Sequence, residues 1–338
     1  MTERRNLLTD VPGLMVGNAD DAKLCSGVTV VLSNRTLIAA VDVRGGGPAT
    51  RETDALGLAG TVDEVHAIVL SGGSAFGLSA ATGAQCWLAE QGRGFEVRGA
   101  RVPIVAQASL FDLLNGGNKS WGESPPYEAL ARKASNAAAP DFALGSAGAG
   151  YGASTATFRG GLGSASAVLP SSIVVGALVA VNAVGSATFG STRHFWASAF
   201  EEASEFGGHG FPSGMDPALL SPRFKGQAGE ATTLAVVATN ARLTKREAHR
   251  LAVMAQSGLS RALYPAHTPL DGDTVFAAST GEIPLRDPIQ NLTAIGIAAA
   301  NVLARAIARG VYEAAVAPPN WCGPPAYRTL HPRPTLIA

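Results

Sequence analysis

A threonine at the start of an apolar run offers the clearest chemistry in this sequence. Residues 232–239 (TTLAVVAT) are typical of a strand, and a small residue, Ala231, precedes them. If the Ala231–Thr232 bond were cut, Thr232 would carry a free α-amine beside its hydroxyl, with a reference pKa of about 7.7–8.0. That amine could act as the base for its own Oγ, as in N-terminal threonine nucleophiles. The pattern alone is weak, because threonine is common at the start of strands.

A pair of carboxylates precedes a second strand. Asp271 and Asp273 flank Gly272, and residues 273–279 are typical of a strand. A tight turn of this kind can direct both carboxylates toward one place, where like charges push their pKa values apart. One carboxylate could orient the amine or hydroxyl of Thr232, and the second could orient the first. A solvated turn is the alternative, whereas a calcium loop would need further oxygen ligands that are absent here.

Two further polar residues are candidates for the same site. Asn182 lies inside the apolar run 172–187, where a buried amide must be hydrogen-bonded, and its amide group could help to form an oxyanion hole. The alternative is a structural amide bonded to the backbone. His267 is close in sequence to the Asp271–Asp273 pair and could contribute to the pocket.

Other motifs are less consistent with their usual functions. Gly72-Gly73-Ser74 resembles a serine nucleophile elbow, but Phe76 replaces the closing glycine of that motif. The loose Gly-x-Gly-x-x-Ala match at residues 148–153 lacks the strand and helix of a dinucleotide site. The six histidines show no metal-ligand spacing. We therefore predict no metal and no cofactor.

Composition excludes several function classes. The chain has 338 residues, 46% hydrophobic and 15% charged, and its 26 basic residues balance 26 acidic ones. This balance gives no reason to expect a nucleic-acid or membrane partner. The apolar run at residues 292–303 is too short to span a membrane, and the start of the chain does not look like a signal peptide. Three widely spaced cysteines indicate a reducing compartment, so we expect a cytoplasmic protein.

The elements that must position these residues follow from periodicity and turn signals. Residues 28–32 and 36–43 are predicted to form a hairpin, residues 67–70 and 172–187 buried strands, and residues 98–122 a loop-rich stretch. Residues 195–230 are predicted to be a mobile surface linker. Thr244 and Glu247 form a capping box that predicts a helix, and residues 287–314 predict a second, buried one. A proline-rich tail from Pro318 is expected to wrap the surface.

Seven blocks together resemble the P1 family of peptidases. This family, also called the DmpA or L-aminopeptidase/D-esterase family, includes nylon-oligomer hydrolases and β-peptidyl aminopeptidases. The resemblance implies a single α+β catalytic domain over 1–338, a four-layer αββα sandwich of N-terminal-nucleophile type, which cuts itself into subunits 1–231 and 232–338. The matching blocks are residues 41–54, 69–83, 102–113, 160–166, 175–185, 232–248 and 267–277.

The resemblance also implies roles for individual residues. Thr232 matches the nucleophile, Asp271 the position that orients it, Asp273 the second acidic position and Asn182 the asparagine that helps to hold the oxyanion. The Gly72–Gly77 block, which contains Ser74, would line the substrate pocket, and Tyr151, Arg159 and His267 are further pocket candidates.

Two positions depart from the family pattern. The residue before the nucleophile is usually asparagine or glycine, whereas this chain has Ala231. Many relatives carry a lysine where Arg159 stands, and arginine remains charged, so its role would be electrostatic.

The family resemblance implies an amidohydrolase or aminopeptidase that acts on small amino-acid amides, peptides or esters and forms a homo-oligomer, which we expect to be a tetramer. An acyltransferase on the same scaffold and an unprocessed, non-catalytic homologue are the alternatives.

Overall fold

The computed structural model describes residues 4–214, 216–226, 231–315, 317–318 and 320–333. In this part of the chain, nine strands form one hydrogen-bonded sheet in the order β3-β7-β4-β2-β11-β10-β9-β8, with β1 paired to β2 outside this path. Two further strands, β5 and β6, form a small separate hairpin. The strands are β1 (Leu14–Asp21), β2 (Ser26–Val43), β3 (Ala49–Arg51), β4 (Glu64–Ser71), β5 (Phe95–Val97), β6 (Ala100–Val102), β7 (Val105–Ser109), β8 (Gly161–Val168), β9 (Val174–Val181), β10 (Leu234–Ala241) and β11 (Thr274–Ile283).

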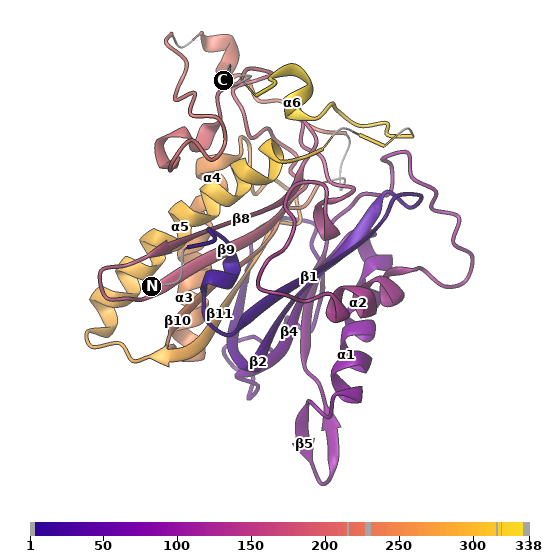
Figure 1. Cartoon of the computed structure of the whole chain (residues 1–338), viewed down its shortest axis with the longest axis vertical. Helices are drawn as coiled ribbons and strands as arrows, with labels where there is room; N and C mark the ends of the chain where they lie inside the picture. The colour runs from indigo at the N-terminus through magenta and orange to yellow at the C-terminus, as the bar shows by residue number, and fades with distance from the viewer. Residues whose placement is uncertain (1–3, 215, 227–230, 316, 319, 334–338) are drawn as a thin grey trace, which may run out of the picture.

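The helices lie in two groups on either side of the strands (Figure 1). The first group follows β4 and β7 in the chain, and the second follows β10 and β11. They are α1 (Ala80–Glu90), α2 (Tyr127–Asn136), α3 (Lys245–Ala255), α4 (Ser257–Ala262), α5 (Pro288–Tyr312) and the short α6 (Tyr327–Leu330).

The strands form two layers, and their alternating side chains contribute to three hydrophobic cores. Val28 and Val30 of β2 pack with α1 and α2, whereas Val31 points to the opposite side. Val179 of β9 packs with α3, α4 and α5, whereas Leu178 faces the same central core as Val31. Because successive residues of a strand point to opposite faces, two strand layers share this central core. The expected α+β sandwich of four layers, αββα, is therefore the observed fold.

The hairpin predicted for residues 28–43 is wrong. These residues belong to one long strand, β2, whose pairing with β4 shifts in register between Leu32 and Leu37. Asn34 and Arg35 are exposed at this shift and resemble turn residues in the sequence. One half of β2 pairs with β1 and the other with β11, so the strand joins the two strand layers.

The two helices predicted from capping and periodicity are present where expected. Thr244 accepts a hydrogen bond from the Glu247 N–H and the Glu247 side chain accepts one from the Thr244 N–H, so the capping box opens α3 as predicted. Asp287 caps α5, which ends at Tyr312. Helix α5 is long and apolar enough to cross a membrane, beyond the short run expected from the sequence. However, 67% of its most apolar window is buried inside the protein, as in a core helix.

Two predicted stretches differ from the structure. The run at residues 172–187 contains a strand only over Val174–Val181, and the loop-rich stretch at residues 98–122 contains β6 and β7. The proline-rich tail covers part of the surface, but its Tyr327 is buried against the core.

The linker predicted at residues 195–230 is more ordered than expected where the structure describes it. Phe195, Ala197 and Phe206 are buried in the core that contains α5. Short 3-10 helices occupy Trp196–Phe200 and Pro217–Leu220. Part of this segment is therefore fixed to the fold, and residues 227–230 lie outside the described residues.

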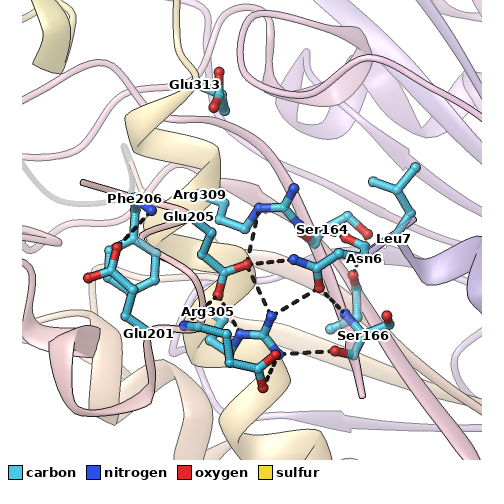
Figure 2. Close-up of polar contacts among 12 residues, drawn as sticks. Asn6, Leu7, Ser164, Ser166, Glu201, Glu205, Phe206, Arg305, Arg309 and Glu313 are labelled. Carbon is cyan, nitrogen blue, oxygen red and sulfur yellow. Dashed lines mark hydrogen bonds and ion pairs between the residues drawn. The ribbon is translucent and has the colours of Figure 1, made fainter. Parts of the chain in front are cut away.

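An ion-pair network centred on the buried Arg305 fixes this segment to α5 (Figure 2). The Arg305 guanidinium donates to Glu205 at 2.5 and 3.0 Å and to Glu202 at 2.9 Å. It also donates to the Asn6 side chain and to the Ser166 carbonyl, both at 3.0 Å. Arg305 follows Thr232 in the chain, whereas its four partners precede it. The network therefore links the part of the chain before the Ala231–Thr232 bond to the part after it.

Candidate active site

Sheet register brings three distant segments together at one edge. β10 pairs antiparallel with β9, with Leu234 opposite Ala180, and parallel with β11, with Leu234 opposite Thr274. The end of β9 therefore lies beside the starts of β10 and β11. Asn182, Thr232 and the Asp271–Asp273 turn are placed just beyond these strand ends and meet at the same edge.

The Ala231–Thr232 peptide bond is held from both sides at this edge. The Thr232 N–H donates to the Asn182 carbonyl oxygen at 2.8 Å, and the Gly272 N–H donates to the Ala231 carbonyl oxygen at 3.0 Å. The Thr232 hydroxyl donates to the same Ala231 oxygen at 2.5 Å. Thr232 is only 3% exposed. Its hydroxyl therefore lies directly beside the Ala231 carbonyl group.

Gly272 permits this close approach. A Cβ atom at position 272 would lie 2.5 Å from the Thr232 Oγ1 and 2.9 Å from the Gly47 carbonyl oxygen. Because neither distance allows a carbon atom, only glycine fits without displacing the threonine. The Gly272 N–H is a hydrogen-bond donor aimed at a carbonyl oxygen, which is the geometry that stabilises a developing oxyanion.

Asp273 fixes the backbone next to Thr232. Its Oδ1 accepts from the Thr233 N–H at 2.9 Å, and its Oδ2 accepts from the His267 N–H and contacts His267 Nδ1, both at 3.0 Å. Burial disfavours the charged imidazole, but the hydrogen bond and charge of Asp273 outweigh burial, so the pKa of His267 is raised. The structure thus brings His267 to the acidic pair, but His267 is not among the residues that line the cavity beside Asn182.

Asp271 holds the opposite wall of the site. Its Oδ1 accepts from the Val184 N–H at 3.1 Å, and its Oδ2 accepts from the N–H and hydroxyl of Thr268 at 2.9 and 2.8 Å. Burial raises the pKa of Asp271, and the nearby Asp273 charge raises it further. The two carboxylates thus interact electrostatically, while their hydrogen bonds hold different segments around Thr232.

Asn182 connects the threonine to a cavity. Its side-chain NH₂ donates to the Phe111 carbonyl at 2.8 Å, and its Oδ1 accepts from the Ser154 N–H at 3.0 Å and from Lys225 Nζ at 2.7 Å. The cavity has a volume of about 260 Å³. Its polar lining includes Asp112, Asn115, Ser154, Asn182 and Lys225, and its apolar lining includes Phe111, Leu114 and Pro324.

The glycine-rich block lies behind this cavity. The Gly73 N–H donates to Asp112 Oδ1 at 2.8 Å, and a Cβ at Gly72 would lie 2.1 Å from Asp112 Oδ2. The Ser74 N–H donates to the Leu110 carbonyl. Gly72 and Gly73 therefore allow the chain to pack tightly around Asp112, and none of these three residues is among those that line the cavity.

Arg159 lies away from the threonine, beneath the C-terminal segment. It is 1% exposed, donates to the Tyr151 carbonyl at 2.6 Å, and stacks on the Trp321 ring at 4.5 Å. Neither Arg159 nor Tyr151 lines the cavity beside Asn182. Arg159 thus holds the tail against the body of the protein.

Three features of the site were missed by the sequence analysis. The Gly272 N–H is a backbone group, and its orientation depends on register. Lys225 comes from the expected linker, and Asp112 follows β7 inside the stretch expected to be loop. A single lysine or aspartate in a loop carries no spacing signal, so the fold alone reveals these residues. Within the described residues, no group of three or more His, Cys, Asp or Glu side chains could hold a metal.

Comparison with known proteins assigns the chain to a family. The model of peptidase family S58 matches residues 6–318. An uncharacterized aminopeptidase of Mycobacterium tuberculosis is 40% identical over 97% of this chain and 98% of its own. A 6-aminohexanoate-oligomer endohydrolase of Kocuria sp. is 31% identical over 89% of this chain and 85% of its own.

Solved structures support the same fold. A Burkholderia β-aminopeptidase aligns with a TM-score of 0.69 at 21% identity, over 99% of this chain and 96% of its own. The L-aminopeptidase D-Ala-esterase/amidase of Ochrobactrum anthropi, described as a variant of the Ntn hydrolase fold, aligns with a TM-score of 0.68 at 22% identity, over 93% and 88%. The chain is therefore a member of peptidase family S58, the DmpA family, has the N-terminal-nucleophile hydrolase fold, and hydrolyses peptide or amide bonds.

Proposed function

We propose that this protein cuts its own Ala231–Thr232 bond and then acts as an aminopeptidase or amidase with Thr232 as nucleophile. The observation that carries this proposal is the contact of the Thr232 hydroxyl with the Ala231 carbonyl oxygen, which also accepts the Gly272 N–H. A nucleophile, its target and an oxyanion donor thus meet at one peptide bond.

Self-cleavage would proceed through an ester. The Thr232 Oγ attacks the Ala231 carbonyl carbon, the C–N bond breaks, and Ala231 is transferred to the threonine oxygen while the Thr232 nitrogen takes up a proton. The Gly272 N–H stabilises the negative charge that develops on the carbonyl oxygen. Water then hydrolyses the ester and releases Ala231 as a carboxylate. Thr232 becomes the first residue of a new chain with a free α-amine.

Substrate cleavage would repeat this chemistry between molecules. The Thr232 α-amine accepts the proton of its own hydroxyl, and Oγ attacks the carbonyl carbon of the substrate. The leaving amine takes up the proton, and water hydrolyses the acyl-enzyme. No histidine is needed, since the base and nucleophile belong to one residue. The Asn182 carbonyl, which accepts the Thr232 N–H in the uncut chain, would orient the new amine.

The acidic residues would position the nucleophile. Asp273 fixes the Thr233 N–H and Asp271 fixes the Val184 N–H, so each holds the backbone within two residues of Thr232 or Asn182. The Asn182 NH₂ is bonded to the Phe111 carbonyl in the uncut chain. Its part in holding an oxyanion is therefore a prediction for the cut enzyme.

Intact-mass measurement of purified protein tests the proposal directly. Wild type should give two fragments that meet between Ala231 and Thr232. Thr232→Ala should remain one chain of 34.3 kDa and should hydrolyse none of a panel of amino-acid amides and esters. Thr232→Ser keeps a hydroxyl and should still split. Turnover by Thr232→Ala at the wild-type rate would refute the proposal.

A further inference from the structure

The C-terminal segment supplies one wall of the cavity in the candidate site. Residues 320–325, which we call the C-terminal strap, place Cys322, Gly323 and Pro324 against this cavity. Among the described residues, the others that line the cavity all precede Thr232 in the chain. The match to the family model ends before the strap begins. The cavity therefore has a wall that lies outside the part of the chain that the family model covers.

Contacts with Arg159 hold the strap in place. The Trp321 ring lies over the Arg159 guanidinium, with 4.5 Å between the central carbon of that group and the ring centroid. The Arg159 backbone N–H donates to the Pro325 carbonyl at 2.8 Å. The Trp321 indole N–H donates to the Pro324 carbonyl, also at 2.8 Å, so the strap folds back on itself. The wall is thus fixed at both of its ends.

Gly116 lets the strap approach the rest of the cavity closely. Its φ is +92°, and a Cβ atom there would lie 1.7 Å from the Asn320 carbonyl oxygen and 2.9 Å from the Cys322 Sγ. Only glycine fits such a position without displacing the strap. Beside it, the Cys322 N–H donates to the Asn115 carbonyl at 3.1 Å. The position of the Cys322 side chain is therefore set by its backbone and by Gly116.

The acyl side of the self-cleaved bond leads toward this cavity. Lys225 lines the cavity and lies six residues before Ala231, whose carbonyl carbon is the acyl centre of self-cleavage. The Asn182 carbonyl accepts both from the Thr232 N–H at 2.8 Å and from Lys225 Nζ at 3.3 Å, so the cavity and the nucleophile meet at Asn182. An acyl group attached to Thr232 would therefore extend into the cavity.

The size of this cavity makes its walls important for specificity. Its volume of about 260 Å³ is below the roughly 300–1,000 Å³ of pockets that take drug-sized ligands. In a close-fitting apolar pocket, one methylene group changes kcat/KM by about 10–200-fold. Cys322 presents a short, exposed side chain at the wall. The size of this side chain therefore limits the space that an acyl group can use.

We propose that the C-terminal strap, through Cys322, determines the largest acyl side chain that the enzyme accepts. The inference rests on the proposed function, since it names the substrate preference of the same site. Cys322 would touch the acyl group, whereas Trp321 and Arg159 act by holding the strap. Small amino-acid acyl groups should therefore react faster than bulky ones, and this preference should change with the size of the side chain at position 322.

A thiol reagent enlarges this wall on the wild-type cut enzyme. Methyl methanethiosulfonate transfers its methylthio group to a cysteine: a new S–S bond forms, the S–S bond of the reagent breaks, methanesulfinate leaves, and the thiol proton goes to solvent. Cys322 and Cys86 are exposed, whereas Cys25 is buried. Because the added group fills the cavity, kcat/KM should fall about tenfold for phenylalanine p-nitroanilide and less than about threefold for alanine p-nitroanilide. Dithiothreitol should restore both values.

Two cysteine variants are the matched controls for this experiment. Cys322→Ser keeps a side chain of similar size without the thiol, so its kcat/KM values should match wild type and should not respond to the reagent. Cys86→Ser, on α1, should respond as wild type does, because it keeps Cys322. Mass spectrometry of peptides confirms which thiol has reacted. If modified Cys322 changed kcat/KM for neither compound, or lowered it equally for both, the proposal would be overturned.

Trp321→Ala loosens the strap without changing the residues that line the cavity. We expect the ratio of kcat/KM for the phenylalanine compound to that for the alanine compound to rise about threefold, since the wall can move outward. Trp87→Ala is the matched control, because Trp87 donates the same indole N–H to Asn136 at 2.7 Å but does not line the cavity. An unchanged ratio in a folded Trp321→Ala would contradict the role of the strap.

The outcomes separate this inference from the proposed function. If Trp321→Ala does not fold, the thiol experiment on the wild-type enzyme still decides the question. A chain that hydrolyses neither compound overturns the proposed function and this inference together. An active, cut enzyme whose preference between the two compounds ignores the strap overturns only this inference.

Discussion

Replacing Gly272 by alanine tests whether backbone geometry sets the rate of self-cleavage. The new Cβ would lie 2.5 Å from the Thr232 Oγ1 and 3.1 Å from its Cγ2. Ordinary contacts of this kind need roughly 3.4 Å, so the threonine or the turn must move by somewhat less than about 1 Å. The same movement would pull the Gly272 N–H away from the Ala231 carbonyl oxygen, now 3.0 Å away.

The size of the effect follows from this displacement. A misplacement of about 1 Å costs about 10²-fold in rate, and removal of one oxyanion donor costs about 10²–10³-fold. We therefore expect Gly272→Ala to slow self-cleavage by at least about 10²-fold, which is about 2.7 kcal/mol in activation free energy. The assay follows the loss of intact chain by mass spectrometry from the moment of purification, beside a thermal melt that checks folding.

Gly47→Ala is the matched control for this prediction. Gly47 follows β2 and donates its N–H to the Asp271 carbonyl oxygen of this turn at 2.8 Å, but a Cβ there would meet only that oxygen, at an ordinary 3.7 Å. This variant should split within about threefold of the wild-type rate, because a contact at van der Waals distance leaves the threonine in place. If Gly272→Ala folded and split as fast as Gly47→Ala, the close approach at Gly272 would not control the reaction.

Three other perturbations have defined outcomes. Arg305→Ala should lower the free energy of unfolding by about 2–3 kcal/mol in a denaturant titration, since it removes two charged hydrogen bonds from the buried Glu205 carboxylate and leaves it only Arg309 and Asn6. His267→Gln should destabilise the protein at low pH. The raised pKa of His267 means that its bond to Asp273 stabilises fully below the ordinary histidine pKa and is lost as pH rises through the raised value. Turnover by the cut enzyme should rise with pH across about 7–8, as the Thr232 α-amine loses its proton.

Each of these has its own contradicting result. Arg242 is an exposed arginine, so Arg242→Ala should cost less than about 1 kcal/mol, and an equal loss for Arg305→Ala would show that the network adds little. Stability curves for wild type and His267→Gln that differ by a constant amount from pH 4 to 9 would contradict the histidine prediction. Turnover that does not change between pH 6 and 9 would exclude the amine as base.

Local signals predicted much of the fold because they act within a few residues. The Thr244–Glu247 capping box and the Asp287 cap mark helix starts through contacts with their own first turns. The error at Asn34 and Arg35 has the same origin. These residues resemble a turn, but pairing with β1, β4 and β11 keeps β2 extended through them. Such pairing depends on distant residues and leaves no local pattern.

The residues of the candidate site likewise fall into those that the sequence predicts and those that only the fold reveals. Thr232, Asp271, Asp273 and Asn182 stand at strand ends, where polar residues beside apolar runs are conspicuous in a sequence. Lys225 gives no such signal, because its relation to Asn182 exists only after the segment has folded across β9. The arrangement of Arg159 beneath Trp321 also depends on the path of the tail, which the sequence leaves open.

The order of the strands has a consequence for an enzyme cut before Thr232. β10 and β11 would belong to the fragment that begins at Thr232. In the sheet, β10 is hydrogen-bonded to β9 and β11 to β2, and both β9 and β2 belong to the fragment that ends at Ala231. The pieces would therefore behave as a permanent heterodimer whose native state needs two molecules to meet. After dilution from denaturant, the uncut precursor should refold at a rate that does not depend on protein concentration. The refolding rate of the cut enzyme should fall as the protein concentration is lowered. Cleavage would therefore make unfolding less reversible at low protein concentration.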